Sequence, residues 1–244
     1  MMTRYLEYNM INKKDIDLII DKNEVLRYLG YGNKEADEIT DGIIDKCLRE
    51  ILEIASTNFV YNIYEIKKGE GKIHFKKSNF RIEGKDIYNH LHTSSKCAIM
   101  AVTLGNEVDK RIRYYSKVDL TKSVIFDACA TAGIEALCDR VESEVKKIAI
   151  SNGCNITSRY SPGYGDLSIE IQPKILNLLD TQKHIGLTVT DSCILIPRKS
   201  VTAFIGIGEE VKVKKLSCKD CRLHDNCLFA KEGDSCGNTK IARQ

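Results

Sequence analysis

Apolar residues recur at helical spacing in three stretches of the first half of the chain. Between residues 37 and 55 they stand at steps of three and four with charged residues between them, which predicts an amphipathic helix. Residues 23–36 show a shorter run of this kind that should stop at Gly30 and Gly32, because glycine tolerates the left-handed turn that ends helices. Residues 106–117 predict a third helix, short and charged.

The longest predicted helix begins at Asp119 or Thr121, either of which can cap it, and runs to about Ile150 before Asn152-Gly153. Its predicted packing stripe consists of Val124, Ala128, Ile134, Leu137, Val141, Val145 and Ile148. Three further residues, spaced i, i+4, i+8, line one flank beside small residues: Asp127, Thr131 and Glu135. This flank favours a site that accommodates a ligand, but a solvated face explains the spacing equally well.

Strand periodicity defines the rest of the chain. Residues 58–82 alternate apolar and polar positions around Gly69-Glu70-Gly71, which predicts a hairpin, and the apolar run at 97–105 predicts a central strand. Pro173 suits the first turn of a helix whose core-facing residues are Ile175, Leu176, Leu178 and Leu179. Strands at the end of the sheet are predicted over residues 186–190, 193–197 and 201–208. The pattern predicts an α+β domain with a largely antiparallel, twisted sheet and flanking helices.

Composition narrows the class of protein. The chain has 244 residues, 43% of them hydrophobic and 29% charged, which is typical of a globular protein and excludes a disordered one. No apolar run is long enough to span a bilayer, and charges interrupt residues 1–15 too early for a signal peptide. We therefore expect a cytoplasmic chain without a membrane segment.

Basic residues gather at one place only. Seven Lys or Arg and two Glu stand between Lys67 and Lys85, with His74, Phe75 and Phe80 among them, so contact with a nucleic-acid backbone and stacking on bases is one interpretation. Lysines that guard exposed strands against edge-to-edge association explain the run better. The net charge of only +3 provides no wider field. We expect no nucleic-acid partner.

The ten cysteines form two groups. In a reducing compartment disulfides are not expected. Six are scattered among mostly apolar neighbours and are predicted to be small core residues: Cys47, Cys97, Cys129, Cys138, Cys154 and Cys193. Four stand close together in a polar C-terminal tail, with the spacing C-x2-C-x5-C-x8-C: Cys218, Cys221, Cys227 and Cys236.

Four clustered cysteines in a segment without a core favour a bound metal over free thiols. Their thiolates can hold a tetrahedral zinc ion or an iron–sulfur cluster, and His224 could replace one of them. Zinc would pin the tail, whereas a [4Fe–4S] cluster could pass an electron. The spacing does not choose between the two.

Familiar nucleotide and protease motifs are missing, and one loop stands out. Gly206-Ile207-Gly208 leads into a charged segment and fails as a dinucleotide fingerprint, and there is neither GxxxxGK[ST] nor HExxH. Residues 159–166, RYSPGYGD, combine a guanidinium, two glycines, a rigid Pro-Gly turn and aromatic rings. Such a loop can clamp a carboxylate and lie against a base, although turn-rich loops often keep these residues only to make a corner.

Several ordered blocks together resemble a known family. These blocks are RYSPGY (159–164), GKDIYNHL (84–91), TLG (103–105), FDACATAGIEALCDRVE (126–142) and TDSCILIPRKSVTAF (190–204). They resemble the activation domain of vitamin B12-dependent methionine synthase, and more closely the stand-alone proteins of that family. The resemblance covers residues 84 to about 207 and is weak in residues 1–83 and in the cysteine tail.

The resemblance implies a module that binds S-adenosylmethionine and docks on a cobalamin-carrying partner when that cofactor has been oxidised to cob(II)alamin. The partner would be cobalamin-dependent methionine synthase or a related corrinoid protein, with an electron donor such as a flavodoxin or ferredoxin. In the family motif RxxPGY the Arg and the final Tyr contact the ligand, as does backbone at the residue before Pro. The implied or candidate binding residues are Arg159, Ser161, Gly163, Tyr164, Glu135 and Asp127.

Two departures from the family concern ligand contacts. An upstream aspartate of the long-chain enzymes has no counterpart that we can align, and a later tyrosine aligns with Ile205 or Phe204. The predicted organisation is a helical segment and hairpin at 1–83 within the same domain, an S-adenosylmethionine-binding core at 84–210 and a metal-binding tail at 211–244.

Two functional hypotheses follow. The first is an accessory reactivation module of methionine synthase that does not turn over alone. The second is a metal-binding redox or regulatory protein that acts on another corrinoid methyltransferase.

Overall fold

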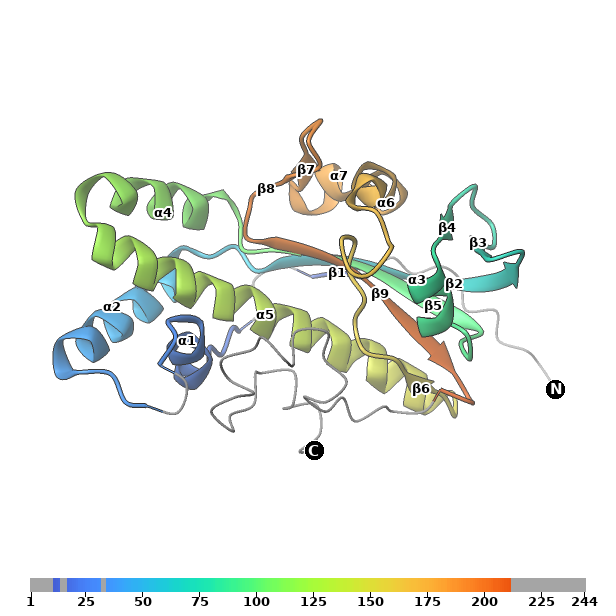
Figure 1. Ribbon diagram of the computed structural model, residues 1–244, viewed down its shortest axis with the longest axis horizontal. Coiled ribbons are helices and arrows are strands. Elements are labelled where there is room, and N and C mark those ends of the chain that lie inside the picture. The colour runs from blue at the N-terminus through green and yellow to red at the C-terminus, as the bar shows by residue number, and fades with distance from the viewer. Residues whose placement is uncertain (1–10, 14–16, 32–33, 212–244) are drawn as a thin grey trace.

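The structure, a computed structural model, describes residues 11–13, 17–31 and 34–211. Its centre is a twisted sheet with the strand order β4-β3-β2-β5-β9-β6 (Figure 1). The short strand β1 is an additional member of this sheet and pairs with β2. The strands are β1 (Ile11–Lys13), β2 (Asn58–Gly69), β3 (Lys72–Phe75), β4 (Arg81–Glu83), β5 (Lys96–Thr103), β6 (Asn155–Ile156) and β9 (Ser200–Gly208). All of these pairs are antiparallel, so the predicted α+β fold with an antiparallel sheet is confirmed.

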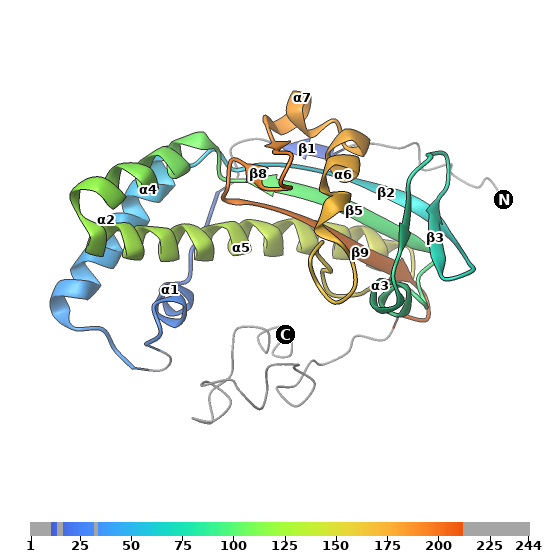
Figure 2. The ribbon, with the colours of Figure 1, turned by 45° about the horizontal axis from the view of Figure 1, so that its top comes forward.

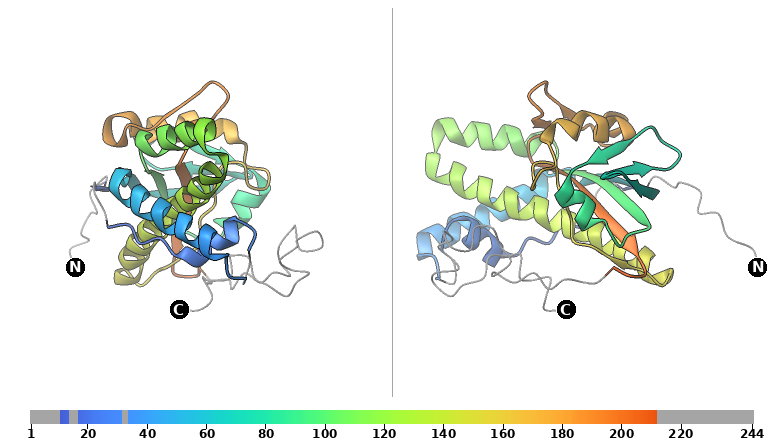
Figure 3. Two further views of the ribbon diagram at one scale, coloured as in Figure 1. Left: turned by 90° about the vertical axis from the view of Figure 1, so that its left-hand side faces the viewer. Right: turned by 45° about the vertical axis from the view of Figure 1, so that its right-hand side comes forward.

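Helices cover both faces of the sheet. The long helix α5 (Leu120–Ser151) crosses one face, and α1 (Lys22–Tyr28), α2 (Glu38–Ile54) and α4 (Asn106–Val118) pack against it (Figure 2). Figure 3 shows α6 (Gln172–Leu178) and α7 (Thr181–Ile185) on the opposite side of the sheet from α5. The helix α3 (Lys85–His90) and a 3-10 turn (Ile169–Ile171) complete the helical elements of the described residues.

The central strand β5 separates two hydrophobic cores. Ala98, Met100 and Val102 contribute to the core under α5, whereas the alternate residues Cys97 and Ile99 belong to the core on the other face. Because successive side chains of a strand point to opposite faces, only a strand covered on both sides needs an uninterrupted apolar run. The prediction of a central strand over 97–105 is therefore confirmed.

Side-chain caps fix the starts of the two longest helices among the described residues. Asp37 precedes α2, and its Oδ1 accepts hydrogen bonds from the backbone N–H groups of Ile39 (3.1 Å) and Thr40 (3.0 Å). At the start of α5 the cap is Asp119 rather than Thr121, since Asp119 accepts from the N–H of Lys122 at 2.9 Å. α5 ends immediately before Asn152-Gly153, as expected.

The packing stripe predicted for α5 is wrong at its first member. Val124 is 55% exposed, and Ile125 and Phe126 are buried instead. At this end α5 packs against α2 and α4, so these helices decide which of its residues face inward. Further along, Ile134, Leu137, Val141 and Val145 are buried as predicted.

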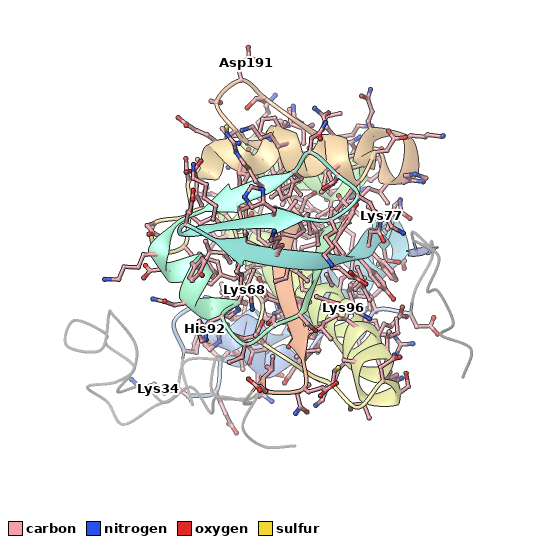
Figure 4. The ribbon with its side chains drawn as sticks, turned by 90° about the vertical axis from the view of Figure 1, so that its right-hand side faces the viewer. Lys34, Lys68, Lys77, His92, Lys96 and Asp191 are labelled. Atoms are coloured by element: carbon pink, nitrogen blue, oxygen red, sulfur yellow. The ribbon has the colours of Figure 1, made fainter. Side chains whose placement is uncertain are left out.

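The hairpin of β2 and β3 turns at residues 69–71 as predicted, and its aromatic residues point inward. Phe75 and Phe80 are buried in the core on the face of the sheet opposite α5, where both pack against Phe204. These two rings therefore cannot stack on bases. Lys68 donates to the carbonyl oxygens of His92 (2.6 Å) and Ser94 (2.7 Å), at the end of the molecule that faces the viewer in Figure 4. At least one lysine of the basic run is thus tied to the protein's own backbone.

Two of the strands predicted at the sheet's end lie elsewhere. β7 (Thr188–Val189) and β8 (Leu195–Ile196) pair only with each other, and β9 alone joins the main sheet. β7 and β8 have two residues each, and hydrogen bonds between Thr190 and Ile194 close the turn that joins them.

The scattered cysteines separate by burial. Cys47, Cys97, Cys129 and Cys138 are buried among apolar residues, as predicted. Burial raises the pKa of the Cys47 thiol to about 11 and that of Cys129 to about 12, so these groups stay protonated and unreactive at neutral pH. The two others, Cys154 and Cys193, are half-buried.

Candidate functional site

The loop that contains the RYSPGYGD motif runs along the edge of the sheet. Backbone hydrogen bonds join Tyr160 and Phe204 in both directions at 2.9 Å, so the segment after β6 continues beside β9 as an irregular edge strand. In Figure 2 this segment lies between α5 and α3. The edge position brings the side chain of Arg159 against α5 and leaves the following residues free to form a turn.

The turn itself is built by the Pro-Gly pair. The Ser161 carbonyl accepts a hydrogen bond from the N–H of Tyr164 at 3.1 Å, and Gly163 has φ of 92°, as a type II turn with proline at its second position requires. Gly165 also has positive φ, 54°, and a Cβ there would overlap Asp86 and the Tyr160 hydroxyl. Both glycines are therefore needed for the shape of the loop.

A carboxylate anchors the far end of this loop to α3. Asp166 accepts hydrogen bonds from the backbone N–H groups of Lys85 (2.5 Å) and Asp86 (3.1 Å), which are the first residues of α3. The helix has no side-chain cap from Gly84, the residue directly before it. Sequence reasoning gave Asp166 no role and did not predict α3, the helix that it caps.

Arg159 lies against three acidic residues of α5. Its Nη1 donates to Asp139 at 2.7 Å and lies 3.4 Å from a Glu142 oxygen, and its Nη2 donates to Glu135 at 3.1 Å. We call these four residues the Arg159 cluster. The structure thus brings Arg159 and Glu135 together; sequence reasoning missed Asp139 and Glu142, which their helical spacing of four and seven residues from Glu135 could have indicated.

Burial shapes the electrostatics of this cluster. The side chains of Arg159 and Glu142 are 19% and 17% exposed. Burial raises the pKa of Glu135 and of Glu142, and the Arg159 guanidinium acts in the opposite direction. Burial disfavours the charge of Arg159, but the negative groups around it outweigh this, so its pKa lies above its ordinary range.

Asp127 lies outside the Arg159 cluster. Its carboxylate pairs with Lys199 at 3.0 Å, and the same Lys199 Nζ donates to Thr131 Oγ1 at 2.8 Å. The predicted flank of α5 therefore has two halves: Asp127 and Thr131 bind a lysine at the start of β9, and Glu135 binds Arg159.

The small residues of that flank accommodate the chain itself. A Cβ at Gly133 would lie 3.2 Å from Ile20 and 3.6 Å from Leu18. Both apolar side chains belong to the segment before α1 and pack against the core under α5. The space beside Gly133 is therefore filled by protein, and the part of the flank around Glu135 is what is left as the candidate ligand site.

Aromatic rings extend the site beyond the turn. Tyr164 is 59% exposed, and its ring stands edge-on to Tyr160 with 5.9 Å between centroids. Tyr160 in turn packs against His90 of α3 at 5.0 Å. Ile205 and Phe204, the two positions that align with the family's later tyrosine, are fully buried, so neither offers a side chain at the surface.

The candidate site lies on the surface along α5, outside the two cavities described next. Two surface cavities, of about 360 and 450 Å³, lie beside β3, β4 and α3 and at the start of α5. No predicted ligand-binding residue lines either of them.

The predicted metal ligands Cys218, Cys221, Cys227 and Cys236 lie outside the described residues. Within the described ranges, no three His, Cys, Asp or Glu side chains stand close enough to hold a metal ion. In the same part of the chain, none of the helices has the length and apolar character that crossing a bilayer requires.

Comparisons with known proteins agree with the resemblance in the sequence. Residues 76–220 match the sequence profile of the vitamin B12-dependent methionine synthase activation domain. The fold is similar to the crystal structure of the MetH reactivation domain bound to AdoHcy, with a TM-score of 0.65 and 15% identity over 96% of this chain and 89% of that one. Among curated proteins, none matches significantly. The profile covers more than half of the chain, which therefore belongs to the family of the activation domain of vitamin B12-dependent methionine synthase.

Proposed function

We propose that this chain binds S-adenosylmethionine at the Arg159 cluster and presents its methyl group to cobalamin on a partner protein. The observation that carries this proposal is the juxtaposition of Arg159, Glu135 and the RYSPGY turn at the exposed flank of α5. A cation and a carboxylate side by side are what recognition of the zwitterionic amino-acid part of such a ligand needs.

Arg159 has capacity for a ligand carboxylate. Its hydrogen bonds to Asp139 and Glu135 use Nη1 and Nη2, and none of the described residues accepts a hydrogen bond from its Nε. Nε and the second N–H of Nη2 form the planar fork that pairs bidentately with a carboxylate. In the proposed complex Glu135 accepts from the ligand's ammonium group, the backbone near Ser161 and Gly163 approaches the ligand, and the exposed Tyr164 ring packs on adenine or on the sulfonium.

The remaining chemistry belongs to other components. Cobalamin on methionine synthase or a related corrinoid protein would supply the reacting cobalt, and a flavodoxin or ferredoxin would supply the electron. This chain would bind, orient and shield the methyl donor and would not turn over alone. Asp127, paired with Lys199, would support the flank of α5 without touching the ligand.

Isothermal titration calorimetry tests the binding site. The chain should bind S-adenosylmethionine, and Arg159→Ala should weaken binding by about 100-fold, because it removes a charge-assisted bidentate pair. Arg140→Ala is the matched control, since Arg140 is an exposed arginine of α5, the helix that Arg159 contacts. Equal affinity in the Arg159→Ala variant would remove this residue from the site.

A reactivation assay tests the biological role. Cob(II)alamin-loaded methionine synthase that lacks its own activation domain should recover methyl-cobalamin only when this chain, S-adenosylmethionine and a reductant are all present. Recovery at the same rate without this chain would contradict the proposal.

The cysteine tail supports a second candidate function, a metal-dependent redox or regulatory role toward another corrinoid methyltransferase. The four-cysteine spacing favours it. Elemental analysis and a visible spectrum after anaerobic purification distinguish the cases: iron with broad absorbance near about 400 nm supports electron transfer, and zinc supports a structural role.

A further inference from the structure

The Arg159 cluster carries more negative charge than its arginine needs. One guanidinium faces three carboxylates, those of Glu135, Asp139 and Glu142, at 2.7 to 3.4 Å. Arg27 and Lys146 lie near enough to influence Glu135 and Glu142, but neither forms an ion pair with an acid of the cluster in the described part of the chain. The four side chains of the cluster carry a net formal charge of −2.

Part of this surplus is poorly solvated, because Glu142 is largely buried, whereas the side chains of Glu135 and Asp139 are 44% and 72% exposed. Glu142 is 17% exposed, and it sits one helical turn beyond Asp139 on the same flank of α5. Burial raises the pKa of both Glu135 and Glu142, which means that a single arginine does not fully compensate their charge. A ligand that adds positive charge beside them relieves this cost.

The two forms of the proposed ligand differ by one positive charge. S-adenosylmethionine carries a sulfonium, and loss of its methyl group leaves the uncharged thioether of S-adenosylhomocysteine with the same carboxylate, ammonium and nucleoside. The sulfur is four bonds from the carboxylate carbon, so it lies within about 6 Å of that carbon. A carboxylate bound to Arg159 therefore keeps the sulfur within Coulombic range of the acids.

We propose that Asp139 and Glu142 are specificity-determining residues that make the site prefer the sulfonium methyl donor over its thioether product. This inference rests on the proposed function. Glu135 and Arg159 recognise groups that both ligands share, whereas the additional carboxylates respond to the charge that only the methyl donor carries. The site then releases the product once the methyl group has left.

The test compares two dissociation constants in each variant. Titration calorimetry at low ionic strength measures S-adenosylmethionine and S-adenosylhomocysteine binding to the full chain, to Glu142→Gln and to Asp139→Asn. Glu144→Gln is the charge-matched control, because Glu144 is two residues further along α5 and lies outside the cluster. Sinefungin, in which an amine replaces the sulfonium, reports whether charge or the methyl group decides.

The wild-type chain should bind S-adenosylmethionine about tenfold more tightly than S-adenosylhomocysteine, with sinefungin resembling the former. Glu142→Gln and Asp139→Asn should each reduce this ratio by about three- to tenfold, and added salt should reduce it too. Loosening of Arg159 would weaken both ligands alike and leave the ratio unchanged. An unchanged ratio in both variants, with S-adenosylmethionine still bound, overturns this inference alone; absence of binding of either ligand to the wild type overturns the proposed function as well.

Discussion

Two charged clusters that involve α5 have opposite arrangements of charge. Near the start of the helix, the single carboxylate of Glu50 lies against Arg111 and Lys122 and accepts from the Tyr115 hydroxyl at 2.8 Å. We call these four residues the Glu50 cluster. In the Arg159 cluster a single guanidinium is surrounded by three carboxylates. Each cluster holds one partly buried charge within charges of the other sign.

The clusters differ in what they join and in what they leave open. The Glu50 cluster takes its members from α2, α4 and α5, and Lys122 also lies 4.1 Å from the centre of the Tyr115 ring. The three acids of the Arg159 cluster all come from α5, and the hydrogen bonds of the arginine to them use Nη1 and Nη2. The first arrangement joins three helices, whereas the second leaves an excess of negative charge on one helix, where we propose that the ligand binds.

The largest expected effect concerns the Glu50 cluster. Glu50→Gln removes the acceptor charge shared by three elements and leaves Arg111 and Lys122 facing each other. We expect the free energy of unfolding to fall by about 2 kcal/mol, because one partner of a partly buried ion pair is lost. Urea denaturation of this variant and of Glu53→Gln, an exposed glutamate of the same helix, measures the difference. Equal losses in both would show that the cluster does not fasten the helices.

An intermediate effect is expected at Asp166, which attaches the proposed binding loop to α3. Asp166→Ala removes the acceptor for two N–H groups at the start of α3. The free energy of unfolding should fall by about 1 kcal/mol, as for other lost helix caps. Affinity for S-adenosylmethionine should fall as well, since the loop that carries Tyr164 loses its attachment. Asp191→Ala, at an exposed turn labelled in Figure 4, should change neither quantity.

The smallest effect is expected in the Arg159 cluster, and it should depend on pH. Glu142→Gln leaves Arg159 with two carboxylates, so its stability at pH 7 should lie within about 0.5 kcal/mol of wild type. Burial raises the pKa of Glu142 in the folded chain, so this group favours folding below the ordinary glutamate pKa of about 4.3 and loses that contribution as the pH rises through its raised pKa.

The free energy of unfolding of Glu142→Gln, relative to wild type, should therefore increase between pH 4 and pH 7. Urea denaturation at both pH values measures this change. A relative stability that decreased with pH would mean that Arg159 stabilises the Glu142 carboxylate more than burial disfavours it, and the cluster would then be as well balanced as the Glu50 cluster.

Local chemistry made much of this protein predictable. The apolar run of β5, the Asp119 cap and the glycine-bounded hairpin each reflect a preference of nearby residues, so the α+β fold and these elements could be predicted from the sequence. Arg159 and Tyr164 could be identified from the sequence as candidate binding residues, because the RYSPGY motif that contains them is contiguous.

Contacts between distant segments were decided only by the tertiary structure. The pairing of Arg159 with Asp139 and Glu142, the anchoring of α3 by Asp166 and the filling of the space beside Gly133 all join residues far apart in the chain. Periodicity shows which residues share a face of a helix or strand, but it does not show which other segments of the chain pack against that face. The sequence by itself therefore determined the main helices and strands and the candidate binding motif. Tertiary packing decided which charges surround Arg159, because Coulombic and packing energies depend on distances that spacing along the chain does not contain.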